Sequence, residues 1–274
     1  MPSFAARTAM ILAVFLCLRS HAAFEVSAAG PRSASLANAI VAAPPDGWAP
    51  FMNPAGVAFC RSLSIGVFHI PGLFGLSELR FSGVGLSVPV AGVGLAISAT
   101  WFGWDLYKET SIRFAVGKEV SSGLGLGLRC QMNRLAISGY GSCTTFTLDL
   151  GVRIECSHSL AIGGILTNVT ASALQVSTET LPQDLSGGIW YAPIPELHIT
   201  LEAGKELLSA PEIRVGVEVD ILKQLTLRAG IIDNPSVVTG GCAFRAADVT
   251  VDYAFAYHWV LGATHEIGLT ISFP

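Results

Sequence analysis

Apolar and polar residues alternate along most of the chain after residue 60. Between Phe146 and Glu155 (FTLDLGVRIE), large apolar residues occupy the even positions, and polar, charged or glycine residues occupy the odd ones. Because successive side chains of a β-strand point to opposite faces, this two-residue period predicts a strand with one apolar and one polar face. The same period recurs in 196–202, 212–219, 248–257 and 266–273. We therefore expect an all-β structure.

The alternation and the turn residues between the alternating segments predict about fourteen strands. They lie at 62–70, 77–88, 92–102, 109–119, 124–132, 144–156, 159–168, 185–192, 196–204, 212–220, 224–231, 237–245, 248–257 and 266–273. Most are near the roughly 9–11 residues that a tilted strand needs to cross a bilayer. The connections alternate between tight turns and longer loops, the clearest loops being 133–143, 169–184 and 258–265. An even strand number with this asymmetry predicts a transmembrane antiparallel β-barrel of the bacterial outer membrane.

The composition favours a membrane around this barrel. Hydrophobic residues make up 51% of the chain and charged residues only 13%, whereas a typical soluble domain has about 25% charged residues. The alternative fold is an exported, water-soluble β-sandwich or small barrel, whose surface would need more charge than this chain offers. The uncharged stretch 81–104 is long enough for a membrane helix, but it contains Pro89 and five glycines and it alternates. Two strands are predicted there instead.

The first 22 residues have the features of a signal peptide. Arg7 precedes the apolar stretch 11–18 (ILAVFLCL), and small residues before and at Ala22 predict cleavage after about that position. Removing residues 1–22 takes away two arginines and no acid, which moves the formal net charge from -4 to -6. An exported, acidic chain of this kind is not expected to bind nucleic acid.

The cysteines and the catalytic motifs give little evidence of chemistry. Five cysteines follow the predicted cleavage site, at positions 60, 130, 143, 156 and 242, without the spacing of a disulfide framework or a zinc site. The chain has no Gly-x-Ser-x-Gly, HExxH or P-loop motif, and 123–127 (GLGLG) belongs to an alternating strand. We therefore expect neither an enzyme nor a cofactor or metal.

Residues 23–60 do not alternate, and they are rich in alanine and proline. After Glu25 their only charged residues are Arg32 and Asp46. A non-strand segment of this length before a barrel is predicted to form a short helical plug inside the lumen. The predicted organisation is thus a signal peptide at 1–22, a plug at 23–60 and the barrel at 61–274.

This segment resembles the amino-terminal hatch of the FadL-type outer-membrane transporters and of the related PorV and PorQ barrels. The resemblance rests on 38–42 (NAIVA), an acidic turn at Asp46, and 53–56 (NPAG) just before the first strand. It implies a fourteen-stranded barrel that allows passive uptake of hydrophobic, fatty-acid-like small molecules past the plug. The PorV/PorQ side of the resemblance implies a non-transporting barrel that acts with secretion-system proteins in protein secretion or surface attachment. Outer-membrane lipids and the outer-membrane assembly machinery are expected partners in both cases.

Two motifs are candidate elements of a gate. Pro54 fixes its φ angle and Asn53 can bond its own backbone, which suits a tight turn, and Ala55 and Gly56 are expected to allow close approach to the barrel wall. These four residues are predicted to anchor or gate the plug. In the second strand, the apolar positions change from odd to even near Ser82 and Gly83. A β-bulge would produce this change, and the resemblance implies that it could form a lateral opening into the membrane.

Three arginines on inward-facing positions are candidate luminal ligand contacts. Arg129, Arg153 and Arg214 could each hold a carboxylate head group, which is the group that a fatty-acid-like ligand would present. The neighbouring strands also place acidic residues beside them, with Arg129 beside the strand from Asp149 to Glu155 and Glu202 near the strand of Arg214. Structural ion pairs are therefore the alternative interpretation of the same arginines.

Overall fold

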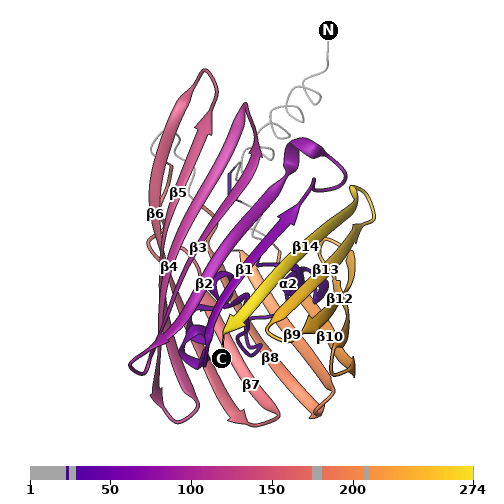
Figure 1. Ribbon diagram of the computed structural model, residues 1–274. Helices are drawn as coiled ribbons and strands as arrows, with labels where there is room; N and C mark the ends of the chain where they lie inside the picture. Colours follow the sequence, from indigo (N-terminus) through magenta and orange to yellow (C-terminus); the bar gives the residue numbers. More distant parts are fainter. Residues whose placement is uncertain (1–22, 25–28, 175–180, 207–209, 274) are drawn as a thin grey trace, which may run out of the picture.

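The computed structural model describes residues 23–24, 29–174, 181–206 and 210–273. Fourteen antiparallel strands form a closed barrel, in which β1 also pairs with β14 (Figure 1). The prediction of an all-β antiparallel barrel with about fourteen strands is confirmed. The predicted signal peptide, 1–22, lies outside the described residues and remains a prediction.

The strands follow one another around the barrel in sequence order. They are β1 (Leu63–Ile70), β2 (Phe81–Val90), β3 (Val93–Trp104), β4 (Tyr107–Ser121), β5 (Leu124–Ile137), β6 (Gly141–Ser157), β7 (Leu160–Leu166), β8 (Asp184–Ile194), β9 (Leu197–Glu206), β10 (Glu212–Leu222), β11 (Leu225–Ile232), β12 (Val237–Ala246), β13 (Val249–His258) and β14 (Gly262–Phe273). The connection between β1 and β2 contains the 3-10 turn η3 (Ser77–Leu79).

The two ends of the barrel differ in their connections. At the end where β1 begins and β14 ends, which we call the inner end, all six connections are two residues long. At the opposite, outer end, the β3–β4 connection is also two residues long, and the other six connections are longer. The loop predicted at 133–143 is wrong for most of its length, because Arg134 pairs with Thr144 and Ala136 with Ser142 in a β5–β6 hairpin. The β5–β6 pairing continues to Ile137 and Gly141, so only residues 138–140 form the turn.

The outer surface of the barrel is apolar around its whole circumference. Large apolar side chains point outward and are 37 to 48% exposed in strands that lie far apart, for example Val84 in β2, Ile97 in β3, Leu201 in β9 and Val251 in β13. Such a continuous exposed apolar surface is unfavourable in water and suits lipid. Among the described residues, no helix combines the length and the apolar sequence needed to cross a bilayer.

The barrel wall has a step between β6 and β7. Strand β6 pairs with β5 from Gly141 onward, but it pairs with β7 only from Leu150, so β6 rises well above the outer end of β7 (Figure 1). The chain after β7 bends toward the lumen, where the Val169 amide donates to the Leu148 carbonyl oxygen at 2.8 Å. The buried Asn168 amide donates to the Asp149 carboxylate, also at 2.8 Å. Below this step, the wall is continuous.

Residues 29–60, which precede β1, lie inside the barrel and form a plug. It contains the short helix α2 (Pro31–Ser35) and the 3-10 turns η1 (Ala49–Phe51) and η2 (Pro54–Phe59). The main buried apolar cluster is made where the plug meets β1 and β2, and it includes Leu36, Trp48, Phe51, Phe68 and Phe81. The core of this barrel is therefore an interface between the plug and the wall.

Candidate functional site

A cavity of about 860 Å³ occupies the outer half of the lumen, above the plug. We call it the outer cavity. The plug contributes Ile40, Val41, Phe51 and Met52 to its lining. The wall contributes Ile165 and residues further around the barrel, including Arg129, Asp184, Glu202, Glu206, Glu212 and Arg214. A volume of this size is in the range of small-molecule sites.

A second cavity, of about 230 Å³, lies at the inner end of the barrel. Its lining is mostly polar, with Asp46, Arg245 and Asp248 among the charged residues. Trp48 of the plug also borders it, and this side chain is only 1% exposed. The plug therefore forms a partition between the outer cavity and the inner cavity.

The wall fits the plug through a ring of inward-facing glycines, which we call the glycine belt. At each of them an added Cβ atom would lie less than 3.0 Å from an atom of the plug. Twelve of the fourteen strands contribute to the belt, with Gly66, Gly85, Gly94, Gly117, Gly125, Gly127, Gly151, Gly163, Gly188, Gly216, Gly230, Gly241 and Gly268. Because glycine lacks a side chain, the plug backbone lies directly against the strands. The plug is therefore held directly against the wall around nearly the whole circumference.

Asn53, at the start of η2, ties the plug to the wall. Its side-chain oxygen accepts a hydrogen bond from the Ala55 amide at 3.0 Å and so caps the turn. Its side-chain amide donates to three carbonyl oxygens: that of Val41 in the plug at 2.8 Å, and those of Val152 and Gly164 in the wall at 3.0 and 3.3 Å. These contacts place Asn53 as an anchor of the plug.

The other three residues of the predicted motif, Pro54, Ala55 and Gly56, differ in how they contact the wall. Pro54 and Ala55 are fully buried, and their backbone atoms lie against Gly127 of β5. Gly56 does not approach the wall, because a Cβ atom added there would have no neighbour within 4 Å. The expectation that Gly56 allows close approach is therefore wrong; the glycine that does so belongs to the wall and not to the plug.

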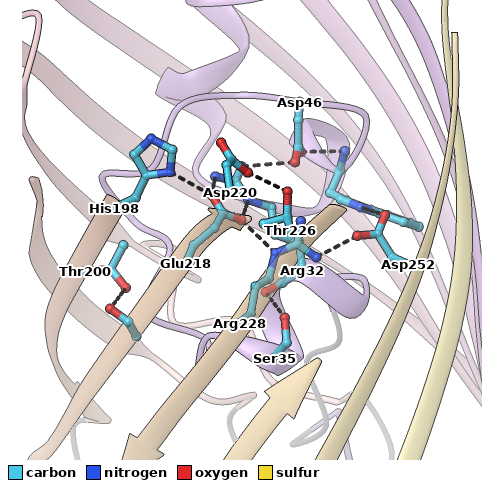
Figure 2. Close-up of polar contacts among 12 residues, drawn as sticks. Arg32, Ser35, Asp46, His198, Thr200, Glu218, Asp220, Thr226, Arg228 and Asp252 are labelled. Atoms are coloured by element: carbon cyan, nitrogen blue, oxygen red, sulfur yellow. Dashed lines mark hydrogen bonds and ion pairs between the residues drawn. The ribbon is translucent and has the colours of Figure 1, made fainter. Parts of the chain in front are cut away.

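An ion-pair network joins the plug to β10, β11 and β13 (Figure 2). Arg32 of α2 contacts Glu218 through two bonds of 3.0 and 3.1 Å, and it contacts Asp46 at 3.0 Å. Arg228 bridges Glu218 and Asp252, at 2.6 Å to each. The indole nitrogen of Trp48 donates to the second oxygen of Asp252 at 3.3 Å. Arg32 and Asp46 of the plug thus bond each other, and Arg32 is also bound by Glu218 of the wall.

The three candidate arginines are all held by protein groups. Arg129 bonds Asp149 at 2.6 Å and the Met52 carbonyl oxygen at 2.7 Å. Arg214 bonds Glu202 at 3.0 Å and also Glu212. These contacts confirm that Arg129 lies beside the strand from Asp149 to Glu155 and that Glu202 lies near the strand of Arg214, and they show which acid each arginine bonds.

The third candidate, Arg153, does not line the outer cavity. It is 1% exposed, bonds the Ala42 carbonyl oxygen and Glu155, and lies 4.8 Å from the ring centre of Phe59. This arginine fixes the end of the plug near β1. The structure therefore brings only Arg129 and Arg214 to the same cavity.

The bulge predicted at Ser82 and Gly83 is wrong. Pairing of β2 with β1 and with β3 is continuous through both residues, so the wall is closed there. The change of apolar face arises because Phe81 points into the lumen, where its ring lies 5.9 Å from that of Phe68. Gly83 leaves room for the Phe68 ring, which an added Cβ would overlap. A lateral opening at this position is not supported.

Two features of the site could not be assigned from the sequence. The role of Arg32 as the link between plug and wall was not predicted, although its isolation in an apolar segment was a signal. The glycine belt was also missed, since a glycine at one inward position per strand becomes meaningful only when the strands are aligned. Among the described residues, no group of three or more histidine, cysteine, aspartate or glutamate side chains is placed to hold a metal ion.

Comparison with known proteins identifies the fold. No protein-family model and no curated protein matches the sequence. Among solved structures, the CymD monoaromatic hydrocarbon channel matches with a TM-score of 0.70 at 12% identity, covering 92% of this chain and 99% of that one. A FadL homologue from Pseudomonas aeruginosa matches with a TM-score of 0.67 at 13% identity, covering 92% of this chain and 100% of that one. The Ralstonia pickettii toluene transporter TbuX also matches with a TM-score of 0.67 at 13% identity, covering 91% of this chain and 98% of that one. The chain therefore has the fold of the FadL-type outer-membrane channels.

Proposed function

We propose that this protein is a bacterial outer-membrane channel for the passive uptake of hydrophobic small molecules. The observation that carries the proposal is the outer cavity, which lies above the plug and is lined near the β6–β7 step by Ile165 and Thr167. Solved structures of the same fold are named as a monoaromatic hydrocarbon channel and a toluene transporter, which supports the same class of ligand here.

The proposed path leads from the outer cavity sideways into the membrane. The straight path through the lumen is blocked by the plug, which the glycine belt and the Arg32 network hold in place. The outer cavity is lined by Ile165 and Thr167, which stand at the outer end of β7, where the step begins. Outside the step, Phe146 and Leu185 present apolar surface that is 61 and 62% exposed. A hydrophobic ligand would thus leave the cavity past Ile165 and Thr167 and enter lipid beside Phe146 and Leu185.

The same proposal includes the location and the organisation of the chain. Residues 1–22 would direct export and be removed, residues 23–60 would form the plug, and residues 61–274 would insert in the outer membrane. The apolar exterior and the two-residue inner turns support this orientation, with the inner end in the periplasm. Lipids and the barrel assembly machinery would be its partners there.

Uptake by whole cells tests the proposal. A bacterial strain that lacks its own hydrocarbon channels would be given this protein, and the entry of labelled toluene would be measured. Ile165→Trp narrows the proposed path and is expected to reduce uptake about tenfold, while Ile162→Trp places the same bulk on the lipid-facing side of β7, where Ile162 is 43% exposed, and should leave uptake unchanged. Equal uptake with and without the folded protein would overturn the proposal and favour the non-transporting alternative.

A further inference from the structure

We propose that the outer cavity selects uncharged ligands over carboxylates, and that Glu212 and Glu202 determine this selectivity by neutralising Arg214. The inference rests on the proposed channel function and narrows its ligand class. It reverses the expectation that luminal arginines hold a carboxylate head group.

Arg214 is the cation that a ligand in the outer cavity would meet near the outer rim. Its side chain is 21% exposed, and it lines the cavity together with both of its partners. One terminal nitrogen bonds Glu202 at 3.0 Å, and the other bonds Glu212. Two carboxylates against one guanidinium leave this part of the wall with a net negative charge. A ligand carboxylate that approached Arg214 would meet two carboxylates already bound to the same guanidinium.

Arg129 offers no alternative site for an anion. Its contacts with Asp149 and with the Met52 carbonyl oxygen direct its donors toward the wall and the plug. Both members of the Arg129–Asp149 pair are less than a tenth exposed. A ligand carboxylate would therefore meet an arginine whose charge is already balanced by a buried partner.

The net charge of the whole cavity lining also opposes the entry of a carboxylate. Of the described residues that line the outer cavity, four are acidic, namely Asp184, Glu202, Glu206 and Glu212, and two are arginines. The formal balance is thus an excess of two negative charges. Entry of a carboxylate would add a like charge to a partly desolvated space, and it would also remove water from that carboxylate. An uncharged ligand of the same shape has neither the charge repulsion nor this cost of removing water.

A matched pair of ligands tests this selectivity on the purified, folded protein in lipid nanodiscs. Benzamide and benzoate have nearly the same shape, but at neutral pH only benzoate is charged. Equilibrium dialysis at pH 7.5 is expected to show benzamide binding at least about tenfold more tightly than benzoate. Glu212→Gln keeps the size of the side chain and removes one charge from Arg214, so benzoate affinity should rise about tenfold while benzamide affinity changes less than about twofold.

The control is Glu196→Gln, which removes one carboxylate from an exposed inner turn, far from the outer cavity. It should leave both affinities unchanged. Equal binding of benzamide and benzoate by the wild type would overturn the selectivity, while the channel function would stand. Preserved selectivity in Glu212→Gln would overturn the role of Glu212. Absence of both binding and toluene uptake would instead reject the channel function itself, and the selectivity with it.

Discussion

Arg32 of the plug and Glu218 of β10 face each other through two parallel contacts, with Nε–Oε2 and Nη2–Oε1 separations of 3.1 and 3.0 Å. Both side chains are at least nine-tenths buried. A two-point contact between a planar guanidinium and a carboxylate fixes orientation as well as distance. The pair therefore sets how the plug is seated relative to the wall, although the two residues are 186 positions apart in the sequence.

Arg32→Met should loosen the plug. The change removes one partner of a buried ion pair and leaves Glu218 with Arg228 and His198. Breaking such a pair costs roughly 3–5 kcal/mol, and we expect about 3 kcal/mol because these partners remain. Guanidinium unfolding in detergent would measure the loss. Lys108→Met is the matched control, since it breaks an exposed pair with Asp105 and should change stability by less than about 1 kcal/mol. Equal effects of the two variants would contradict the proposed role of Arg32.

Gly127→Ala should destabilise the barrel, because the added methyl group would overlap the backbone of the plug at Pro54 and Ala55. We expect a loss of about 1–3 kcal/mol, as for other overpacked cores. The matched control is Gly187→Ala in β8, where the nearest atom to the added Cβ is 3.9 Å away. Both variants would be compared by the temperature at which the folded barrel loses its compact migration in gel electrophoresis. A Gly127→Ala barrel as stable as the control would show that the plug is not tightly fitted.

Gly56→Ala should be neutral or stabilising. An added Cβ finds open space, and replacing glycine reduces the conformational freedom of the unfolded chain, an effect worth about 0.4–1 kcal/mol. Guanidinium unfolding would measure the change. A loss of more than about 1 kcal/mol would mean that Gly56 has a role in the plug that its surroundings in this structure do not explain.

The reactivity of the Cys60 thiol would measure how deeply the junction between the plug and β1 is buried. Burial raises the pKa of its thiol to about 11. Since the thiolate is the reactive form, iodoacetamide at pH 8 should react at least about tenfold more slowly with folded protein than with protein unfolded in urea, when Cys60 is the only cysteine kept. The rate for the folded protein should still rise between pH 9 and pH 11. A rate that levels off near pH 9 would indicate a thiol in water.

The strands and their number could be predicted because alternation is a local property. The Phe146–Glu155 pattern indicates which side chains share a face, and repeating it gives fourteen segments that each overlap one of β1 to β14. Strands β5, β6 and β14 nevertheless extend several residues into the predicted loops 133–143 and 258–265. The local pattern gave a wrong prediction where a residue from another strand determined the direction of a side chain. Phe81 looked like a break in the strand because the aromatic residue Phe68, which receives it in the lumen, comes from a different strand.

The sequence by itself determined the barrel, the identity of the plug segment and the excess of acidic residues, because each follows from the order or number of residue types. Only the tertiary structure decided what the charged residues do. Whether Arg214 is free for a ligand depends on Glu202 and Glu212, which neighbouring positions on β9 and β10 bring to it. The position of Arg32 depends on its contact with Glu218. The fit of the plug depends on glycines of twelve strands that all lie against it. These relations come from strand register and barrel closure, which no local stretch of sequence encodes.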